Sequence, residues 1–206
     1  MKGLIYKEIC MFKIQFKSWL FAFAILGVYA AVLKSPYFIN TMTAVFGLMT
    51  CLTTFSYDKM YRCDEYICSM PVSRKKIVLS KYLFLLLIDL SITVFSLAAA
   101  LIFNQFFKED VTELFLASAG VLAATMLLQM IAMPVLYKWG PDKGRILFTV
   151  LAISPFLLLM VFKDHMPGQV DEAVFFHLLQ AAPFLMILIL VVSVMLSIGI
   201  YKKKEF

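Results

Sequence analysis

The series of long apolar runs is the feature that most constrains this chain. The longest, Ile77 to Phe107, holds only two charged residues, Lys81 and Asp89. A helix rises about 1.5 Å per residue, so about 20 apolar residues cross the hydrocarbon core of a bilayer. The runs do not alternate between apolar and polar residues at every second position. They therefore predict transmembrane helices and argue against a transmembrane barrel.

Composition excludes a soluble domain. The 206 residues are 63% hydrophobic and 16% charged, with a mean hydropathy of +0.91. Such a chain cannot cover its surface with polar groups. We therefore predict one all-α, multi-pass membrane domain over residues 1–206. The chain has no GxxxxGK[ST], HExxH or GxSxG motif, so the sequence predicts no enzyme and no catalytic residue.

The apolar runs predict six transmembrane helices. A Gly-Pro turn at Gly140 separates the fourth from the fifth, Pro134 and Pro155 are expected to bend these two spans, and Pro183 is expected to end the apolar stretch before the sixth. The predicted spans are Ser18–Leu33, Tyr37–Tyr57, Ile77–Phe107, Leu114–Tyr137, Ile146–Phe162 and Phe184–Tyr201.

Basic residues are distributed unequally between the connecting segments. Sixteen of the 19 Lys and Arg residues fall in the amino terminus, the segment after Tyr57, the turn near Lys138 and the carboxyl terminus. The positive-inside rule assigns these four segments to the cytoplasm. We therefore expect both termini inside the cell and the protein in the plasma membrane. The net charge of +6 then reflects topology and contact with anionic lipid, and no nucleic-acid partner is predicted.

The amino terminus, residues 1–17, is predicted to be an amphipathic helix in the membrane interface. Ile5, Ile9, Phe12 and Phe16 form one stripe, with lysines beside it. A loosely ordered basic terminus is the alternative. A secretory signal peptide is rejected, because nothing downstream is typical of a secreted soluble domain.

Polar and small residues share single faces of three predicted spans. Gly47 and Cys51 lie on the polar face of the second span, and Ser118, Thr125 and Gln129 line one side of the fourth. Such faces indicate either a seam between helices or a translocation path, and both interpretations stay open. For Asp89 a proton relay, a substrate contact and a hydrogen-bonding clasp are the three hypotheses. The candidate path residues are Asn40, Thr43, Thr50, Thr54, Asp89, Thr93 and Ser96.

The segment from Tyr57 to Tyr82 is the longest polar interruption. Within residues 58–70, apolar side chains recur at steps of three and four, which predicts a short amphipathic helix, with Asp58 paired to Arg62 at i, i+4. Such a helix either lies on lipid or enters a groove in a cytoplasmic partner. The stripe consists of Met60, Cys63, Ile67 and Met70.

No metal site is predicted. Cys63 and Cys68 are five residues apart, which does not match a compact zinc pair. The outer loop around His165, with its acidic residues, is interpreted as solvated charge.

The same polar interruption carries a resemblance to a known family. Tyr57-Asp58, Tyr66, the string Met70 to Val78 (MPVSRKKIV) and Lys81-Tyr82 resemble the pattern that begins the third span of type-2 ABC exporter permeases. The similarity is to the six-span branch that includes exporters of phenol-soluble modulin peptides and bacteriocin-related permeases. That branch has Leu-Pro where this chain has Met70-Pro71.

The resemblance implies a division of labour between subunits. The permease would bind no cofactor itself, would pair with a second copy as a homodimer or heterodimer, and would dock residues 58–70 as a coupling helix onto a separate ATP-binding subunit that holds ATP and Mg²⁺. It also implies a bacterial exporter of amphipathic or hydrophobic peptides, with a short re-entrant helix before Pro183. The coupling residues would be Asp58, Met60, Cys63, Tyr66, Ile67, Met70, Pro71 and Arg74.

A stand-alone proton-coupled carrier or a membrane scaffold is the alternative function. Carriers built from inverted repeats show matching broken helices in their two halves. Here Pro134, Pro155 and Pro183 all lie in the second half, which favours the permease.

Overall fold

The computed structural model describes residues 2–33, 37–63, 66–67, 72–107, 110–162 and 172–203. Over these residues the secondary structure is helical, which confirms the all-α prediction. The long helices are α1 (Lys2–Leu33), α2 (Tyr37–Met60), α4 (Arg74–Phe107), α5 (Val111–Phe162) and α6 (Glu172–Lys203).

Helix α5 consists of two segments joined at Gly140. Gly140 has φ 78° and ψ 176°, a conformation that glycine adopts without a steric penalty because it lacks a Cβ. Pro141 follows, and its fixed φ suits the first position of a new helix. The Gly-Pro turn expected between the fourth and fifth spans is therefore present as a sharp break, and the bundle has six long helical segments.

Four helices in the described part of the chain are long and apolar enough to cross a membrane, or five if a bent pair in α1 counts as one span. The pair, Gly3–Ile14 and Phe16–Tyr29, bends by 52°, near the predicted junction between the interfacial helix and the first span. The four spans are Ile39–Met60, Arg74–Ile102, Val111–Ile146 and Leu185–Lys203.

Helix α6 corrects one expectation. The segment before Pro183 was predicted to end there, but the backbone remains helical from Glu172 to Lys203. Proline removes one backbone hydrogen bond and bends a helix, and such a helix can still continue when its neighbours are satisfied.

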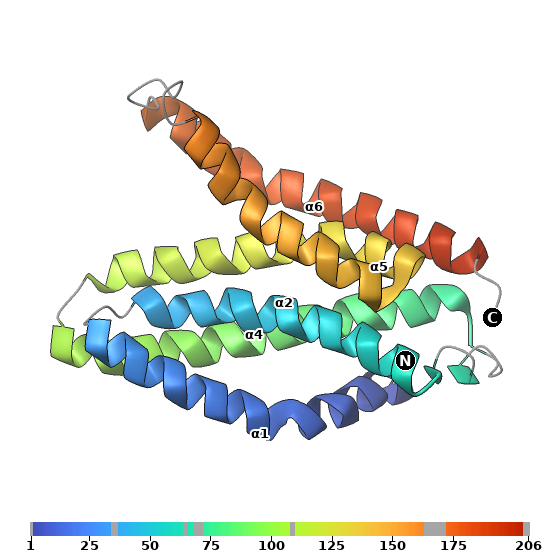
Figure 1. The fold of residues 1–206 in the computed structure, drawn as a ribbon. Helices are drawn as coiled ribbons and strands as arrows, with labels where there is room; N and C mark the ends of the chain where they lie inside the picture. The colour runs from blue at the N-terminus through green and yellow to red at the C-terminus, as the bar shows by residue number, and fades with distance from the viewer. Residues whose placement is uncertain are drawn as a thin grey trace.

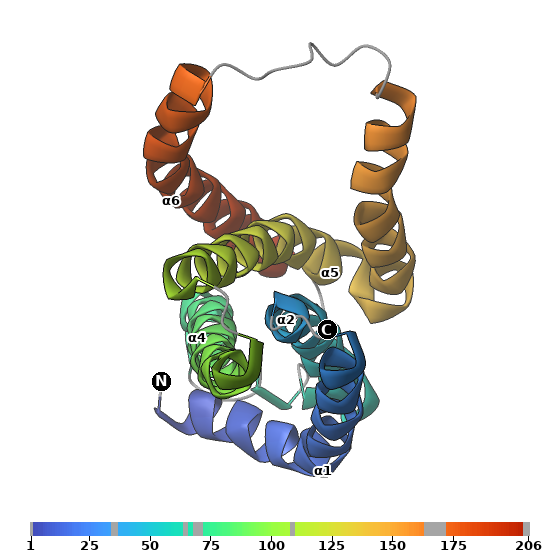
Figure 2. The same ribbon diagram turned by 90° about the vertical axis from the view of Figure 1, so that its left-hand side faces the viewer.

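Helix α2 occupies the middle of the bundle, where it contacts α1, α4 and α5, while α6 packs on α4 and α5 (Figure 1). The start of α1, the end of α2, the start of α4 and the end of α6 meet at one end of the bundle, which we call the basic end. Figure 2 shows that the second segment of α5 and the first turns of α6 diverge from the other helices. The largest apolar core lies at the basic end and includes Phe55, Val78, Met133, Leu136 and Tyr201.

The amino-terminal helix packs on the bundle through one face and leaves part of the predicted stripe on the outside. Leu4 and Phe12 pack against the core and Glu8 is buried, whereas Ile9 and Phe16 are exposed. The ion pair between Lys7 and Asp58 joins this face of α1 to α2.

Candidate functional site

Asp58 lies near the end of α2 and joins three helices at the basic end. Its side chain is buried, with 4% of the residue exposed. Lys7 Nζ of α1 donates to Asp58 Oδ1 at 2.6 Å, and Lys81 of α4 donates to Asp58 Oδ2. Lys7 Nζ also lies 3.0 Å from Glu8 Oε1. One carboxylate therefore holds α1 and α4 against α2, and we call these four residues the Asp58 cluster.

Aromatic rings surround the Asp58 cluster. Lys81 Nζ lies 3.8 Å from the centroid of the Phe55 ring, a favourable arrangement for a cation that has left water. Phe55 contacts Tyr137 at 4.9 Å between centroids, and Tyr137 contacts Tyr201 at 5.5 Å. Lys81 is buried, because its carboxylate partner lies inside the bundle.

The predicted helix of residues 58–70 also needs correction. Asp58 and Met60 belong to α2, and Arg62, with φ 49°, follows where α2 has ended. Arg62 is therefore not the partner of Asp58. The left-handed conformation of Arg62 breaks the helical register between Met60 and Cys63, and of the described stripe residues Met60 is exposed whereas Ile67 is buried.

The candidate coupling residues separate into two groups. Met60 and Tyr66 are exposed, whereas Ile67 is 5% exposed and belongs to the core. Cys63 is half-buried, and its burial raises the pKa of the thiol. Residues 64–65 and 68–71, which include Met70 and Pro71, lie outside the described residues.

Arg74 begins α4 and ties it to the end of α6. Its Nη1 donates to the carbonyl oxygen of Lys202 at 2.7 Å and to that of Tyr201 at 3.3 Å. Carbonyls in the last turn of a helix lack partners within the helix and favour a cation. The connection between α2 and α4 is thus anchored at both ends, by Asp58 and by Arg74.

The candidate path residues lie in the interior, between α2, α4 and α5. Thr43 and Ser96 hydroxyls are 2.8 Å apart across α2 and α4, and Asn40 Nδ2 donates to the Leu114 carbonyl at 3.5 Å. We call this region the polar seam. Thr50 and Thr93 donate to carbonyls of their own helices, and Thr54 is buried.

Asp89 is at the centre of the polar seam and pairs with a residue that the sequence did not connect to it. Gln129 Nε2 of α5 donates to Asp89 Oδ1 at 3.1 Å. A Cβ placed on Gly47 would lie 2.7 Å from the same oxygen, so glycine allows α2 to approach the pair. The polar stripe of the fourth span predicted that Gln129 lies on an inward face. It did not identify Asp89 as the partner of Gln129.

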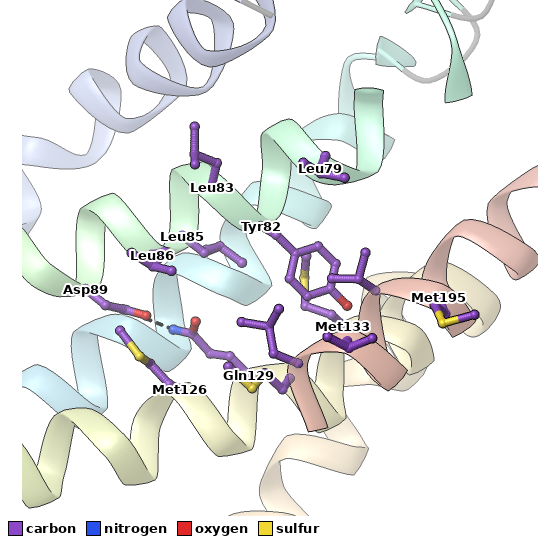
Figure 3. Close-up of a pocket in the computed structure, with 14 residues that line it drawn as sticks. Leu79, Tyr82, Leu83, Leu85, Leu86, Asp89, Met126, Gln129, Met133 and Met195 are labelled. Carbon is purple, nitrogen blue, oxygen red and sulfur yellow. Dashed lines mark hydrogen bonds between the residues drawn. The ribbon is translucent and has the colours of Figure 1, made fainter. Parts of the chain in front are cut away.

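Asp89 and Gln129 also border a cavity of about 340 Å³ between α4, α5 and α6 (Figure 3). Most of its wall is apolar, and methionines from two helices contribute. The sequence does not predict this cavity, because its lining residues are distributed over three spans and form no motif. The methionines are Met126, Met130, Met133 and Met195.

A family model described as "ABC-2 family transporter protein" matches residues 3–202. The chain belongs to the ABC-2 transporter family. No curated protein and no solved structure matches it. The match covers the amino-terminal helix, the Asp58 cluster, the polar seam and the cavity, so all of them are parts of one ABC-2 permease.

The ABC-2 assignment determines the chemistry expected of this chain. It is a multi-pass membrane component of a transporter, and ABC-2 permeases lack ATPase activity and bind no cofactor of their own. They generally work with a separate ATP-binding subunit. In the part of the chain that the structure describes, no group of three or more His, Cys, Asp or Glu residues could hold a metal ion. The loop of residues 163–171, with His165, lies outside that part.

Proposed function

We propose that this ABC-2 permease is the membrane subunit of a bacterial ATP-driven exporter in the plasma membrane that moves amphipathic or hydrophobic peptides out of the cell. The observation that supports this most directly is the family match over residues 3–202. The predominantly apolar spans, with hydroxyls, amides and one carboxylate in their interior, suit a substrate of low charge. The likeness to the phenol-soluble modulin and bacteriocin branch rests on the Tyr57 to Tyr82 pattern.

The basic end faces the cytoplasm in this proposal, with both termini inside and the amino-terminal helix in the interface. The ATP-binding subunit docks on the connection between α2 and α4, where Met60, Tyr61 and Tyr66 are exposed. Because Asp58 and Arg74 anchor this connection to α1, α4 and α6, a displacement of the connection moves the helices with it. ATP closes the partner subunits and supplies the displacement.

Transport through the polar seam requires α2 and α4 to separate. In this chain Thr43 and Ser96 bond to each other across the seam, and their hydroxyls become available to a substrate only when the two helices part. A second permease copy then forms the other wall of the path.

Co-purification and reconstitution test the proposal. Tagged protein from native membranes should bring down an ATP-binding subunit, and the complex in liposomes should export a fluorescent amphipathic peptide when ATP is supplied. Met60→Ala with Tyr66→Ala should lower peptide-stimulated ATPase activity without loss of the permease from the membrane. Val94→Ala, at an exposed position in the middle of α4, is the matched control.

The result that would overturn the proposal is equally clear. Purified protein that brings down no ATP-binding subunit, and whose transport follows a pH gradient and not ATP, would be a stand-alone carrier. Ile67 is unsuitable for a docking test, because a charge at this buried position would disturb the core.

A further inference from the structure

Asp89, which borders the cavity between α4, α5 and α6, has one unsatisfied oxygen that is itself buried. Asp89 is 1% exposed and lines the cavity. Its Oδ1 accepts from Gln129, whereas its Oδ2 has no hydrogen-bond partner among the described residues. Buried polar atoms are nearly always paired, and an unpaired carboxylate oxygen in an apolar setting is costly. A ligand that donates to this oxygen would remove that cost.

The hydroxyl groups near the cavity and the amide nitrogen of Gln129 already have hydrogen-bond partners. Tyr82 Oη lies 2.7 Å from Ser193 Oγ and 2.9 Å from Ser197 Oγ, and Ser193 also donates to the Met130 carbonyl. Gln129 uses its amide on Asp89. Asp89 is also the one charged residue among the lining residues that the structure describes. The Gln129 carbonyl oxygen and the Asp89 carboxylate are therefore the acceptors that border the cavity, and of the two only Asp89 is acidic.

The rest of the cavity suits a flexible apolar body. The cavity volume of about 340 Å³ falls within the range of ligand-binding sites. A water-sized group occupies about 30 Å³, so the cavity has room for roughly ten groups of that size. The four methionine side chains can adjust their rotamers to different shapes. On the outer side, Leu79, Leu83 and Val191 are exposed, so the cavity opens at the surface of the bundle, where a ligand can enter from the bilayer.

We infer that this cavity binds an apolar molecule that carries a protonated amine, with the amine donating to Asp89 and the apolar body lying among the methionines. The site adjoins the polar seam, and the Asp89–Gln129 pair belongs to both. The inference depends on the proposed function in one respect, which is that the bound ligand is then a substrate of the exporter. Binding itself requires neither ATP nor the partner subunit.

Binding of three probes with the same tail to the purified full-length permease tests the inference. The probes are dodecylamine, dodecyltrimethylammonium and dodecanol, measured without nucleotide in detergent by calorimetry. A hydrogen bond to a charged group contributes enough that dodecylamine should bind about tenfold more tightly than dodecanol. Dodecyltrimethylammonium, which has charge but no donor, should fall between them.

Two variants separate the polar contact from the cavity. Asp89→Asn should bring the three affinities to within about twofold of each other, because Gln129 keeps its acceptor while the charge is lost. Val191→Trp should fill the cavity and weaken all three probes about tenfold. Val192→Trp is the matched control, since Val192 is next along α6, has 49% exposure against 48% for Val191, and does not line the cavity.

Three results would overturn the inference. Equal affinities for amine and alcohol in the unaltered protein would make the cavity a site for neutral lipid chains. An amine preference that survives Asp89→Asn would place the amine elsewhere. Absence of binding together with loss of a permease dimer in Val191→Trp would show that a second copy covers the cavity. Each of these outcomes leaves ATP-driven export untouched, whereas loss of export with intact amine binding would refute only the proposed function.

Discussion

Asp58 and Asp89 are both buried carboxylates on apolar helices, yet their surroundings differ. Asp58 is contacted by two lysines, Lys7 and Lys81, from two other helices. Among the residues that the structure describes, Asp89 is hydrogen-bonded by a single amide and keeps one oxygen unpartnered. A carboxylate neutralised on both oxygens fixes helices to each other. A carboxylate that is only half satisfied holds its helices less firmly and retains the capacity to bind something else.

The largest effect is expected from the substitution Asp58→Asn. The amide removes the negative charge and leaves Lys7 and Lys81 near each other without it. Breaking a buried ion pair by removing one partner costs about 3–5 kcal/mol. The free energy of unfolding, measured by titration with a denaturing detergent, should fall by that amount.

An exposed ion pair provides the control for Asp58. Lys59 at the end of α2 pairs with Asp142, and both side chains are largely exposed. Surface pairs contribute little, because water screens them. Asp142→Asn should leave the unfolding midpoint unchanged. Equal losses in the two variants would show that burial of Asp58 does not determine its contribution.

The next effect concerns how closely α2 approaches Asp89. Gly47→Val adds a Cβ 2.7 Å from Asp89 Oδ1 and 3.2 Å from Thr125 Cγ2, and the branched side chain adds more. Overpacking of this kind costs about 1–3 kcal/mol, so the unfolding free energy should fall by that amount. Gly120→Ala, where a Cβ meets nothing within 4 Å, should have no effect. A tolerated valine at position 47 would mean that α2 can move away from the Asp89–Gln129 pair at little cost.

Sequence rules that act within one helix explain why the surroundings of Asp89 were predicted better than the ion-pair partners of Asp58. Helical periodicity put Asp89 on the same face as Thr93 and Ser96; Asp89 and Ser96 are buried, and Thr93 is partly buried. For Asp58 the local i, i+4 rule selected Arg62. The actual partners, Lys7 and Lys81, are 51 and 23 residues away, and no spacing rule identifies partners on other helices.

Hydropathy predicted the existence and position of the helices better than the residues at which they begin and end. The apolar runs located α2 and α4 within a few residues. The continuation of α6 through Pro183 could not be predicted, because a proline either ends a helix or bends it depending on what its neighbours supply. The cavity was likewise unpredictable, since its lining residues come from three helices and not from any one of them.

A smaller loss of unfolding free energy is expected at the hydrogen bond between Thr43 and Ser96 in the polar seam. Thr43→Val removes the hydroxyl that bonds Ser96 across α2 and α4, and a neutral hydrogen bond contributes about 1 kcal/mol. Combined with Ser96→Ala in a double-mutant cycle, the two losses should be non-additive by a similar amount. Thr50→Val is the comparison, because Thr50 bonds within α2 and should show no coupling to Ser96. Additive losses for Thr43 and Ser96 would mean that the seam residues do not hold these helices together.

The smallest change in stability is expected from Asp89→Asn. The new side chain keeps an acceptor for Gln129 and occupies the same volume, while the unpartnered charged oxygen is replaced by a neutral amide nitrogen. The unfolding free energy should therefore change by less than about 1 kcal/mol, and removal of an uncompensated charge favours a gain over a loss. The same chemical substitution thus has opposite consequences at the two positions: at Asp58 it weakens the fold, and at Asp89 it spares the fold while abolishing the preference for an amine. Equal losses of unfolding free energy at both positions would contradict this comparison. They would mean that the number of lysines around a buried carboxylate does not determine whether it stabilises the fold or is free to bind a ligand.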